Sequence, residues 1–247
     1  MDAVQAQGWM AALWILWALA LFGGFVIGKP DAKREHRIPR PARMTASALL
    51  VMAAWVSALA SGGIAFDRLT TWTALGMTFG FIGDLFMAGL LIRGDTRVMG
   101  GIGAFGIGHV LYIIGIVTFI DVAALAVVEA IAIPLVLFWI GVAVVGWYLA
   151  VWRGSDKTTL HRIALGYALL LAGTAAAASV AMTGAAFMAV VMVGAALFLI
   201  SDLVLASQLF KGTYFHLISD VVWFTYSPGQ MLIVYGVALT WLLPLIT

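Results

Sequence analysis

Two aspartates lie inside long apolar segments of the sequence. Asp84 is the only charged residue within residues 75–92, and Asp202 is the only one within residues 194–206. A charged side chain at the centre of a bilayer costs about 2.5–3.5 kcal/mol on insertion scales, so such residues usually face a protein interior or a wet cavity. Two acids in matching surroundings therefore predict a pair that carries the function.

A pair of neighbouring carboxyl groups suits acid–base chemistry. Burial and mutual repulsion favour a state in which one group is protonated and the other is ionised. The protonated group can donate a proton, and the ionised group can stabilise a cation or activate water. The sequence therefore predicts a functional carboxyl pair, Asp84 and Asp202, against the plainer interpretation that each Asp only fixes helix packing.

Other polar residues inside apolar segments could support this pair. His109 and Tyr112 share a helical face at i, i+3 and could each hydrogen-bond a carboxyl group. Tyr226 and Gln230 share another face and need partners within the membrane, so we expect them to hold water or part of a substrate. Ser201 directly precedes Asp202. For all five, an ordinary hydrogen bond between helices is the structural alternative.

Several chemistries are excluded by the residues present. The chain has no cysteine, and it contains no P-loop, nucleophile elbow or HExxH motif. His109 is the only histidine well inside an apolar segment, so a zinc site built on several histidines is not expected. We therefore predict no metal and no cofactor. A pI near 9 does not indicate nucleic-acid binding here, because the basic residues follow a membrane topology.

The composition is that of an integral membrane protein. Of the 247 residues, 64% are hydrophobic and 10% are charged, against about 25% charged in soluble domains. We expect an all-α, multi-pass fold that forms one membrane domain over residues 1–247. About 20 apolar residues cross a bilayer, which predicts eight spans, at 9–28, 44–63, 70–92, 98–119, 124–152, 160–182, 184–208 and 219–244.

Two of these spans contain proline. The fifth is too long for one straight crossing, so we expect an interfacial start or a kink at Pro134. In the eighth, Pro228-Gly229 predicts a kinked or loosened helix.

The basic residues set the expected orientation. Twelve of the thirteen fall in loops or span ends on one side under the eight-span topology, and only Arg68 falls on the other side. By the positive-inside rule the basic side is cytoplasmic. Both termini are then predicted on the non-cytoplasmic side of the cell membrane.

The two aspartates also suggest an internal repeat. Each lies nine residues before a basic residue, Arg93 or Lys211, which at 1.5 Å per helical residue places both about 13–14 Å from that flank. They are four spans apart, so the predicted halves, 1–121 and 122–247, would be parallel repeats about an axis along the membrane normal.

The polar residues form an ordered set of short motifs between residues 75 and 233. They read Gly83-Asp84, then Gly103-x-Phe105-x-x-x-His109-x-x-Tyr112, then Phe198-x-x-Ser201-Asp202-x-x-Leu205-Ala206, then Tyr226-x-x-x-Gln230-x-Leu232-Ile233. In order and spacing this set resembles the YhhN family of membrane lysoplasmalogenases, which also share the eight-helix plan.

The resemblance implies hydrolysis of the vinyl-ether bond of lysoplasmalogens, with Asp84 and Asp202 as the catalytic pair. The products would be a fatty aldehyde and a glycerophospho-ethanolamine or -choline. We favour Asp202 as the acid because Ser201 beside it adds no charge. His109 and Tyr112 would orient one carboxyl group, and Arg93, Arg97 or Lys211 could meet the headgroup phosphate. The partners implied are a lysophospholipid and membrane lipid.

Two other classes stay open on the residues alone. A proton-coupled transporter of small molecules or lipids would use the same two aspartates to carry protons between its halves. A packing or assembly protein would use them only as structural hydrogen-bond partners.

Overall fold

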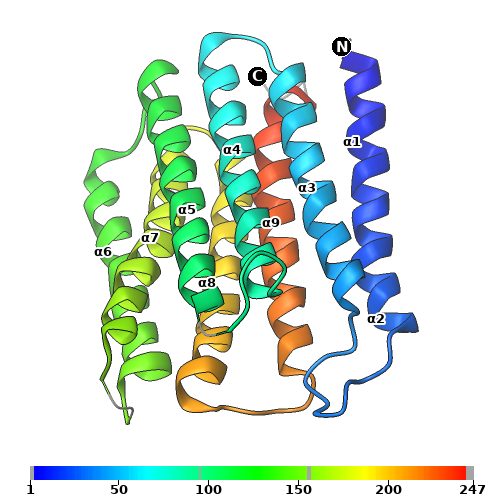
Figure 1. Ribbon diagram of the computed structural model, residues 1–247. Helices are drawn as coiled ribbons and strands as arrows, with labels where there is room; N and C mark the ends of the chain where they lie inside the picture. The colour runs from blue at the N-terminus through cyan, green and yellow to red at the C-terminus, as the bar shows by residue number, and fades with distance from the viewer. Residues whose placement is uncertain (1–2, 95, 155–156, 243–247) are drawn as a thin grey trace.

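The helices run side by side with alternating direction, so that successive connections lie at opposite ends of the bundle (Figure 1). The computed structural model describes residues 3–94, 96–154 and 157–242, and no strand occurs among them. The helical segments are α1 (Ala3–Ala18), η1 (Leu19–Gly23, a π-helical turn), α2 (Gly24–Ile27), α3 (Arg40–Ala60), α4 (Ile64–Met87), α5 (Thr96–Val122), α6 (Glu129–Trp147), η2 (Tyr148–Trp152, also π-helical), α7 (Thr159–Ala181), α8 (Met188–Lys211) and α9 (Ile218–Leu242).

Six helices of the described chain are long and apolar enough to cross a membrane. They are Val4–Ile27, Arg40–Ala60, Thr96–Val122, Glu129–Trp152, Thr159–Ala181 and Met188–Lys211. The predicted fold class is therefore confirmed as all-helical with membrane-type helices, but the count of eight spans is not confirmed. The two remaining long helices, α4 and α9, contain the polar residues Asp84 and Gln230, and such residues lower the apolarity of a helix.

The end of α4 differs from the predicted span of 70–92. Gly89 has a left-handed φ of +68°, its N–H donates to the Phe86 carbonyl at 2.9 Å, and the Leu90 N–H donates to the Leu85 carbonyl at 3.0 Å. This pair of bonds is a Schellman motif, which ends a helix. Asp84 therefore lies in the last turn of α4, and the expected helical distance of 13–14 Å to Arg93 is wrong.

The two prolines have different consequences. The fifth predicted span, 124–152, becomes helical only at Glu129, so its first residues form a connection and Pro134 lies near the helix start. By contrast, α9 continues through Pro228 from Ile218 to Leu242 as one helix, and the kink or loosening expected at Pro228-Gly229 stays a prediction. The last two residues of the predicted span 219–244 lie outside the described ranges.

Nearly all basic residues gather at one end of the bundle, which we call the basic end. This end carries the connections α2–α3, α4–α5, η2–α7 and α8–α9, and Arg68 alone lies near the opposite end. The first described helix starts and the last one ends at that opposite end (Figure 1). The predicted grouping of basic residues is thus reproduced. The assignment of the basic end to the cytoplasm stays a prediction. The location of both termini outside the cytoplasm also stays a prediction, since residues 1–2 and 243–247 lie outside the described part.

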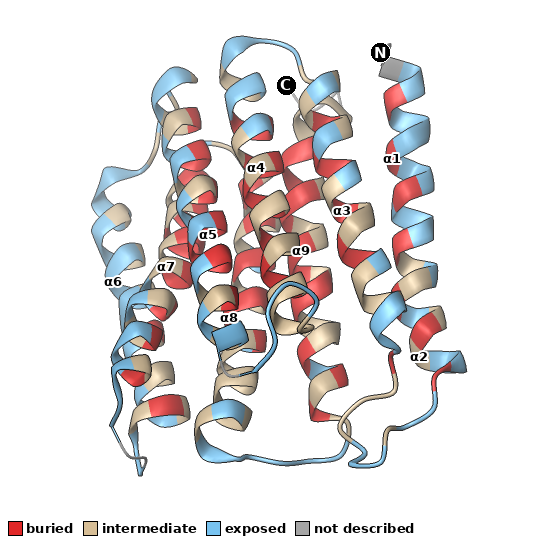
Figure 2. Ribbon diagram, in the orientation of Figure 1, coloured by how far each residue is buried: buried red, intermediate tan, exposed pale blue. Residues whose placement is uncertain are grey.

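The packing order of the helices is similar in the two halves of the chain. Contacts within the first half join α1 to α3, α3 to α4 and α4 to α5; those within the second join α6 to α7, α7 to α8 and α8 to α9. Between the halves, α5 contacts α7, α3 contacts α9, and α4 also contacts α9. A parallel repeat would produce this pattern, and superposition of the halves 1–121 and 122–247 stays a prediction. Buried residues concentrate on the inward faces, whereas α6 at the edge is mostly exposed (Figure 2).

A loop closes over the basic end of the bundle. We call residues 28–39 the strap. Buried Asp220, in the first turn of α9, accepts hydrogen bonds from the strap N–H groups of Arg37 at 2.6 Å and Ile38 at 3.0 Å. Within the strap, the N–H groups of His36 and Glu35 donate to the Asp31 carboxylate and hold its pKa below the ordinary value. The strap is thus fixed to α9 by side-chain hydrogen bonds.

Replacing Asp220 with Ala is expected to release the strap. Both N–H groups would lose their acceptor, and an unsatisfied buried donor costs about 1–3 kcal/mol. Hydrogen exchange of Arg37 and Ile38 should accelerate, while exchange in the middle of α9 stays slow. Asp121→Ala, an exposed acid at the end of α5, is the control. Unchanged exchange in the strap would contradict this assignment.

Candidate functional site

The carboxylate of Asp84 is buried where three helices meet. It accepts a hydrogen bond from the Ser47 hydroxyl of α3 at 2.5 Å and another from the Tyr226 hydroxyl of α9 at 2.8 Å, both on Oδ2. Only 4% of the residue is exposed. Because α4 ends early, Asp84 lies one turn from the helix terminus and therefore close to the α4–α5 connection.

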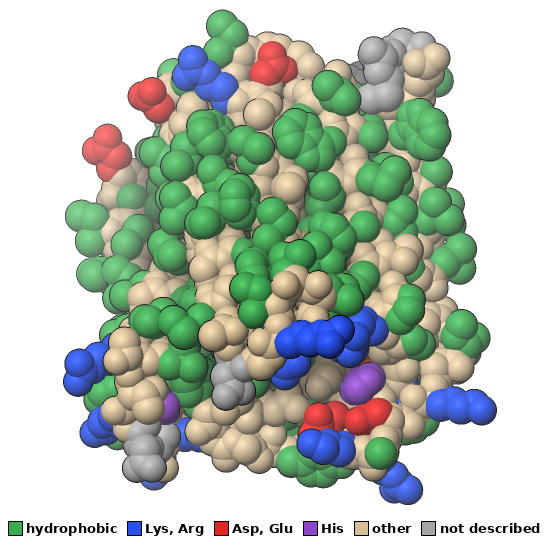
Figure 3. Space-filling model, in the orientation of Figure 1, with side chains coloured by type: hydrophobic (Ala, Val, Ile, Leu, Met, Phe, Trp, Pro, Cys, Tyr) green, Lys and Arg blue, Asp and Glu red, His purple; other side chains and the backbone are tan. Residues whose placement is uncertain are grey.

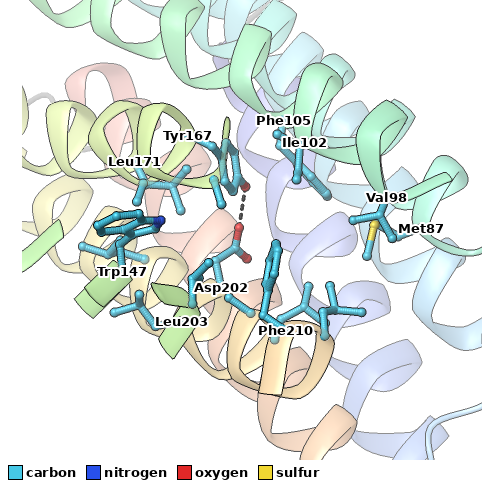
Figure 4. Close-up of a pocket in the computed structure, with 17 residues that line it drawn as sticks. Met87, Val98, Ile102, Phe105, Trp147, Tyr167, Leu171, Asp202, Leu203 and Phe210 are labelled. Atoms are coloured by element: carbon cyan, nitrogen blue, oxygen red, sulfur yellow. Dashed lines mark hydrogen bonds between the residues drawn. The ribbon is translucent and has the colours of Figure 1, made fainter. Parts of the chain in front are cut away.

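Asp202 takes a corresponding position in the second half of the chain. The Tyr167 hydroxyl of α7 donates to its Oδ2, as the dashed line in Figure 4 shows. Ser201 lies 3.3 Å from Oδ1, but its hydroxyl also donates to the Phe198 carbonyl at 2.7 Å. Each aspartate therefore accepts a hydroxyl donor from the preceding helix of its own half, Ser47 on α3 or Tyr167 on α7.

Both aspartates line one cavity of about 350 Å³, which we call the polar cavity. Its lining residues are Glu35, His36, Arg40, Arg43, Met44, Asp84, Met87, Ala88, Arg97, Phe105, Asp202, Leu205, Gln208, Leu209, Ser219, Val222, Trp223 and Tyr226. The cavity thus extends from the two acids to the strap at the basic end. The predicted meeting of Asp84 and Asp202 at one cavity agrees with this geometry, although the helix assumed to run from Asp84 to Arg93 ends at Met87.

A second, apolar pocket adjoins the polar cavity at Asp202. Aromatic and aliphatic side chains from α5 to α8 surround it, among them Trp147, Leu171 and Phe210 (Figure 4). Besides Asp202, the two spaces share Met87, Phe105, Leu205 and Leu209. Asp84 lines only the polar cavity. Asp202 consequently stands at the boundary between an apolar and a polar compartment.

Among the described residues, no hydrogen bond joins His109, Tyr112 or Gln230 to either aspartate. The Tyr112 hydroxyl donates to Gln230 Oε1 at 2.9 Å, and His109 Nδ1 lies 2.8 Å from the Thr174 hydroxyl. His109 instead packs its ring against Phe198, with centroids 4.5 Å apart. The expectation that His109 and Tyr112 orient a carboxyl group directly is therefore not reproduced, because His109 Nδ1 and the Tyr112 hydroxyl pair with Thr174 and Gln230, while the buried His109 Nε2 has no partner among the described residues.

Of the three basic residues expected at the mouth of the site, Arg97 lines the polar cavity, whereas Arg93 and Lys211 do not. Arg97 lines the polar cavity, but Arg93 lines only an adjoining groove that it shares with Arg40 and Arg97. The Lys211 ammonium donates to the Leu149 carbonyl and is not part of the cavity wall. In its place Arg43, at the start of α3, faces the cavity.

Sequence reasoning missed Tyr167, Ser47 and Arg43. A hydroxyl group in an apolar helix commonly bonds its own backbone, so Ser47 among alanines and Tyr167 among leucines gave no distinct signal. Arg43 was counted with the basic loop because it precedes the apolar run. A helix start at Arg40 places it on the helix face that carries Ser47 one turn later.

The fold and site define a class of protein. It is a bundle of membrane-type helices with two aspartates on one polar cavity, each of which accepts a hydrogen bond from a hydroxyl group of another helix. The chain matches the YhhN family over residues 41–237, most of its length. It belongs to the YhhN family. No curated protein and no solved structure matches the chain significantly.

Proposed function

We propose that this protein hydrolyses the vinyl-ether bond of lysoplasmalogens, releasing a fatty aldehyde and a glycerophospho-headgroup. The observation that carries the proposal is the position of Asp202 between the apolar pocket and the polar cavity. In a lysoplasmalogen the vinyl ether joins the hydrocarbon chain to the polar glycerol phosphate. A substrate with its chain in the apolar pocket would therefore bring this bond to Asp202.

The reaction requires a proton on carbon. A protonated carboxyl group transfers its proton to the vinyl carbon on the chain side, and the other vinyl carbon becomes an oxocarbenium ion. Water adds to this cation and loses a proton to a carboxylate. The resulting hemiacetal breaks its bond to the glycerol oxygen, which leaves as a hydroxyl group, and the aldehyde is formed. Glycosidases divide the same roles between two carboxyl groups for a similar cation.

The surroundings of the two aspartates support an unequal division of roles. Asp202 borders the pocket where the vinyl carbons would lie, which favours it as the proton donor. Asp84 lies in the polar cavity and accepts two hydroxyl donors, Ser47 and Tyr226, an arrangement that stabilises an ionised carboxylate. Asp84 would then stabilise the cation and orient the attacking water.

The apolar pocket has room for only part of a long alkyl chain, since its volume is about 60 Å³. The remainder of the chain would leave sideways between helices into the membrane lipid. Such a path supports a substrate drawn from the membrane, with the polar cavity facing the cytoplasm as the basic residues predict.

Purified protein in detergent micelles tests the proposal with 1-alkenyl and saturated 1-alkyl lysophospholipids of equal chain length. Fatty aldehyde should appear only from the alkenyl lipid. In D₂O, the aldehyde trapped by borohydride reduction should carry deuterium on carbon 2, because that carbon takes the proton. If no aldehyde is released but another bond of a lysolipid is cleaved, the protein is a hydrolase and the vinyl ether is not its substrate.

Removing the tyrosine hydroxyls is expected to slow the reaction without stopping it. Tyr226→Phe and Tyr167→Phe each remove one donor to an aspartate. A hydrogen bond contributes about 1.5–3 kcal/mol to the ionised Asp84 and about 0.5–1.5 kcal/mol to the protonated Asp202. We expect kcat/KM to fall by about 10- to 100-fold in Tyr226→Phe and by about 2- to 10-fold in Tyr167→Phe. Tyr148→Phe, on an exposed residue of η2, is the matched control, and equal rates in all three variants would contradict the assigned contacts.

A proton-coupled transporter is the alternative that the same experiment separates. It requires a path from the aspartates to the opposite end of the bundle. The buried Tyr112–Gln230 pair and the close α4–α5 packing, in the middle of the helices, lie in the way of such a path. Proton-dependent flux in proteoliposomes without aldehyde release would favour the transporter.

A further inference from the structure

Three arginines face the polar cavity without a carboxylate partner. Arg40, Arg43 and Arg97 line its wall, and no Asp or Glu lies within ion-pair distance of them in the described part of the chain. The Nε atom of Arg43 is buried and lacks a hydrogen-bond acceptor. A buried donor without an acceptor costs about 1–3 kcal/mol. An anion in the cavity would supply the acceptor that Arg43 Nε lacks.

Arg43 is held in a fixed position relative to the aspartates. Its guanidinium group lies 5.7 Å from the centre of the Trp223 ring, a cation–π arrangement. On α3 it precedes Ser47, the hydroxyl donor to Asp84, by four residues, which is about one helical turn and roughly 6 Å along the axis. An anion bound to Arg43 would lie about one turn from Asp84.

An acidic side chain completes the mouth of the cavity. Glu35, in the strap, lines the cavity with Ser219 and Gln208. The Ser219 N–H donates to the Glu35 carbonyl at 2.9 Å, which brings these two residues together. No hydrogen bond or ion pair of the Glu35 carboxylate occurs among the described residues. Figure 3 shows basic, acidic and histidine side chains close together at the lower end of this face.

We propose that the polar cavity recognises a phosphoethanolamine headgroup, with the phosphate on Arg43 and Arg97 and the ammonium on Glu35. The planar guanidinium fork matches phosphate oxygens. The inference deepens the proposed function, on which its substrate class rests. The residue order from the acids to the arginines to Glu35 matches the order of vinyl ether, phosphate and amine in such a lipid.

The mouth of the cavity distinguishes ethanolamine from choline. A primary ammonium donates three hydrogen bonds, and Glu35, Ser219 and Gln208 offer acceptors. A quaternary ammonium donates none and is recognised by cages of aromatic rings. Of the three aromatic residues on the cavity wall, Trp223 lies against Arg43, Tyr226 donates to Asp84, and Phe105 packs edge-on against Tyr226. Ethanolamine is therefore the preferred headgroup.

Binding of uncleavable lipids tests the site independently of catalysis. The purified full chain is titrated with 1-O-alkyl-glycerophosphoethanolamine, its phosphocholine analogue, and 1-O-alkylglycerol, which has no phosphate. The phosphoethanolamine lipid should bind about 10- to 100-fold more tightly than alkylglycerol, as expected for charge-assisted hydrogen bonds. Equal affinities for these two lipids would overturn the proposal, and stabilisation by inorganic phosphate alone would replace the lipid headgroup with free phosphate.

Three variants assign the contacts. Arg43→Gln should remove most of the preference for phosphate while leaving alkylglycerol affinity unchanged; Arg97→Gln provides the same test if the first variant does not fold. Glu35→Gln should reduce the preference for ethanolamine over choline. Arg162→Gln and Glu129→Gln, both exposed and outside the cavity wall, are the matched controls. A preference unchanged in Arg43→Gln and Arg97→Gln would reject the phosphate site.

The two proposals fail in different ways. Headgroup-selective binding that depends on Arg43, with no aldehyde release from any vinyl ether, would retain this site and reject the proposed reaction. Aldehyde release at equal rates from alkenylglycerol and its phosphoethanolamine derivative would retain the reaction and reject the headgroup site.

Discussion

Asp202→Asn is expected to reduce kcat/KM for aldehyde release by about 10²- to 10⁴-fold, the usual contribution of a general acid or base. Asparagine has the shape of aspartate, and its carbonyl oxygen can still accept the Tyr167 hydroxyl. It cannot transfer a proton to carbon. The loss should therefore appear in kcat with little change in binding of an uncleavable alkyl lipid.

Asp84→Asn should cause a loss of similar size for a different reason. The amide carries no charge, so it can neither stabilise the oxocarbenium ion nor accept a proton from water. If Asp202 is the donor, the residual rate of Asp202→Asn should rise as the pH falls, since hydronium can replace the missing acid. The residual rate of Asp84→Asn should lack this rise.

The controls are two exposed acids at the end of the bundle opposite the basic end. Asp67→Asn in α4 and Asp121→Asn in α5 make the same chemical change away from the cavity. Thermal unfolding of each variant establishes that it is folded. Full activity in folded Asp84→Asn or Asp202→Asn would end the proposal of a catalytic pair.

The helical class was predictable because hydrophobicity alone specifies it. Long apolar runs have few alternatives in a membrane, so the predicted spans agree with the observed helices to within a few residues in most cases. The end of α4 was missed because residues 88–92 are as apolar as the helix before them. Its termination depends on the backbone conformation at Gly89, which hydrophobicity does not report.

Site residues were predictable where burying the side chain in an apolar helix costs free energy. Asp84 and Asp202 were evident because an acid in an apolar helix needs an explanation. Tyr167 and Ser47 were not evident because their importance depends on which helix lies opposite them. His109 shows the converse, since its residue type suggested chemistry but its neighbours are Thr174 and Phe198.

The packing of α8 on α9 is expected to be the most sensitive point of the fold. A Cβ atom added at Gly194 would lie 2.6 Å from the Gly229 carbonyl oxygen and 2.9 Å from the Ile233 nitrogen. Both are backbone atoms, so no rotation of a side chain can relieve the clash and the helices must separate. Gly194→Ala should lower the free energy of unfolding by about 1–3 kcal/mol, the usual cost of overpacking.

The same contact is linked to the site. Gly194 lies two helical turns before Asp202 on α8, and Gly229 lies one turn after Tyr226 on α9. Separation of the helices would displace Asp202 relative to Tyr226 and Asp84, so activity should fall together with stability. Gly76 lies at the corresponding place before Asp84, and a Cβ there would lie 2.9 Å from the Gly108 carbonyl oxygen.

Gly166→Ala on α7 is the matched control, because a Cβ at that position meets no atom within 4 Å. Alanine favours a helix more than glycine does, so this variant should be as stable as the parent or slightly more stable. Unfolding by heat in one detergent, followed by circular dichroism, compares the three proteins. If Gly194→Ala unfolds at the same temperature as Gly166→Ala, the close backbone contact does not hold α8 and α9 together, and the position of Asp202 must depend on the side chains around it instead.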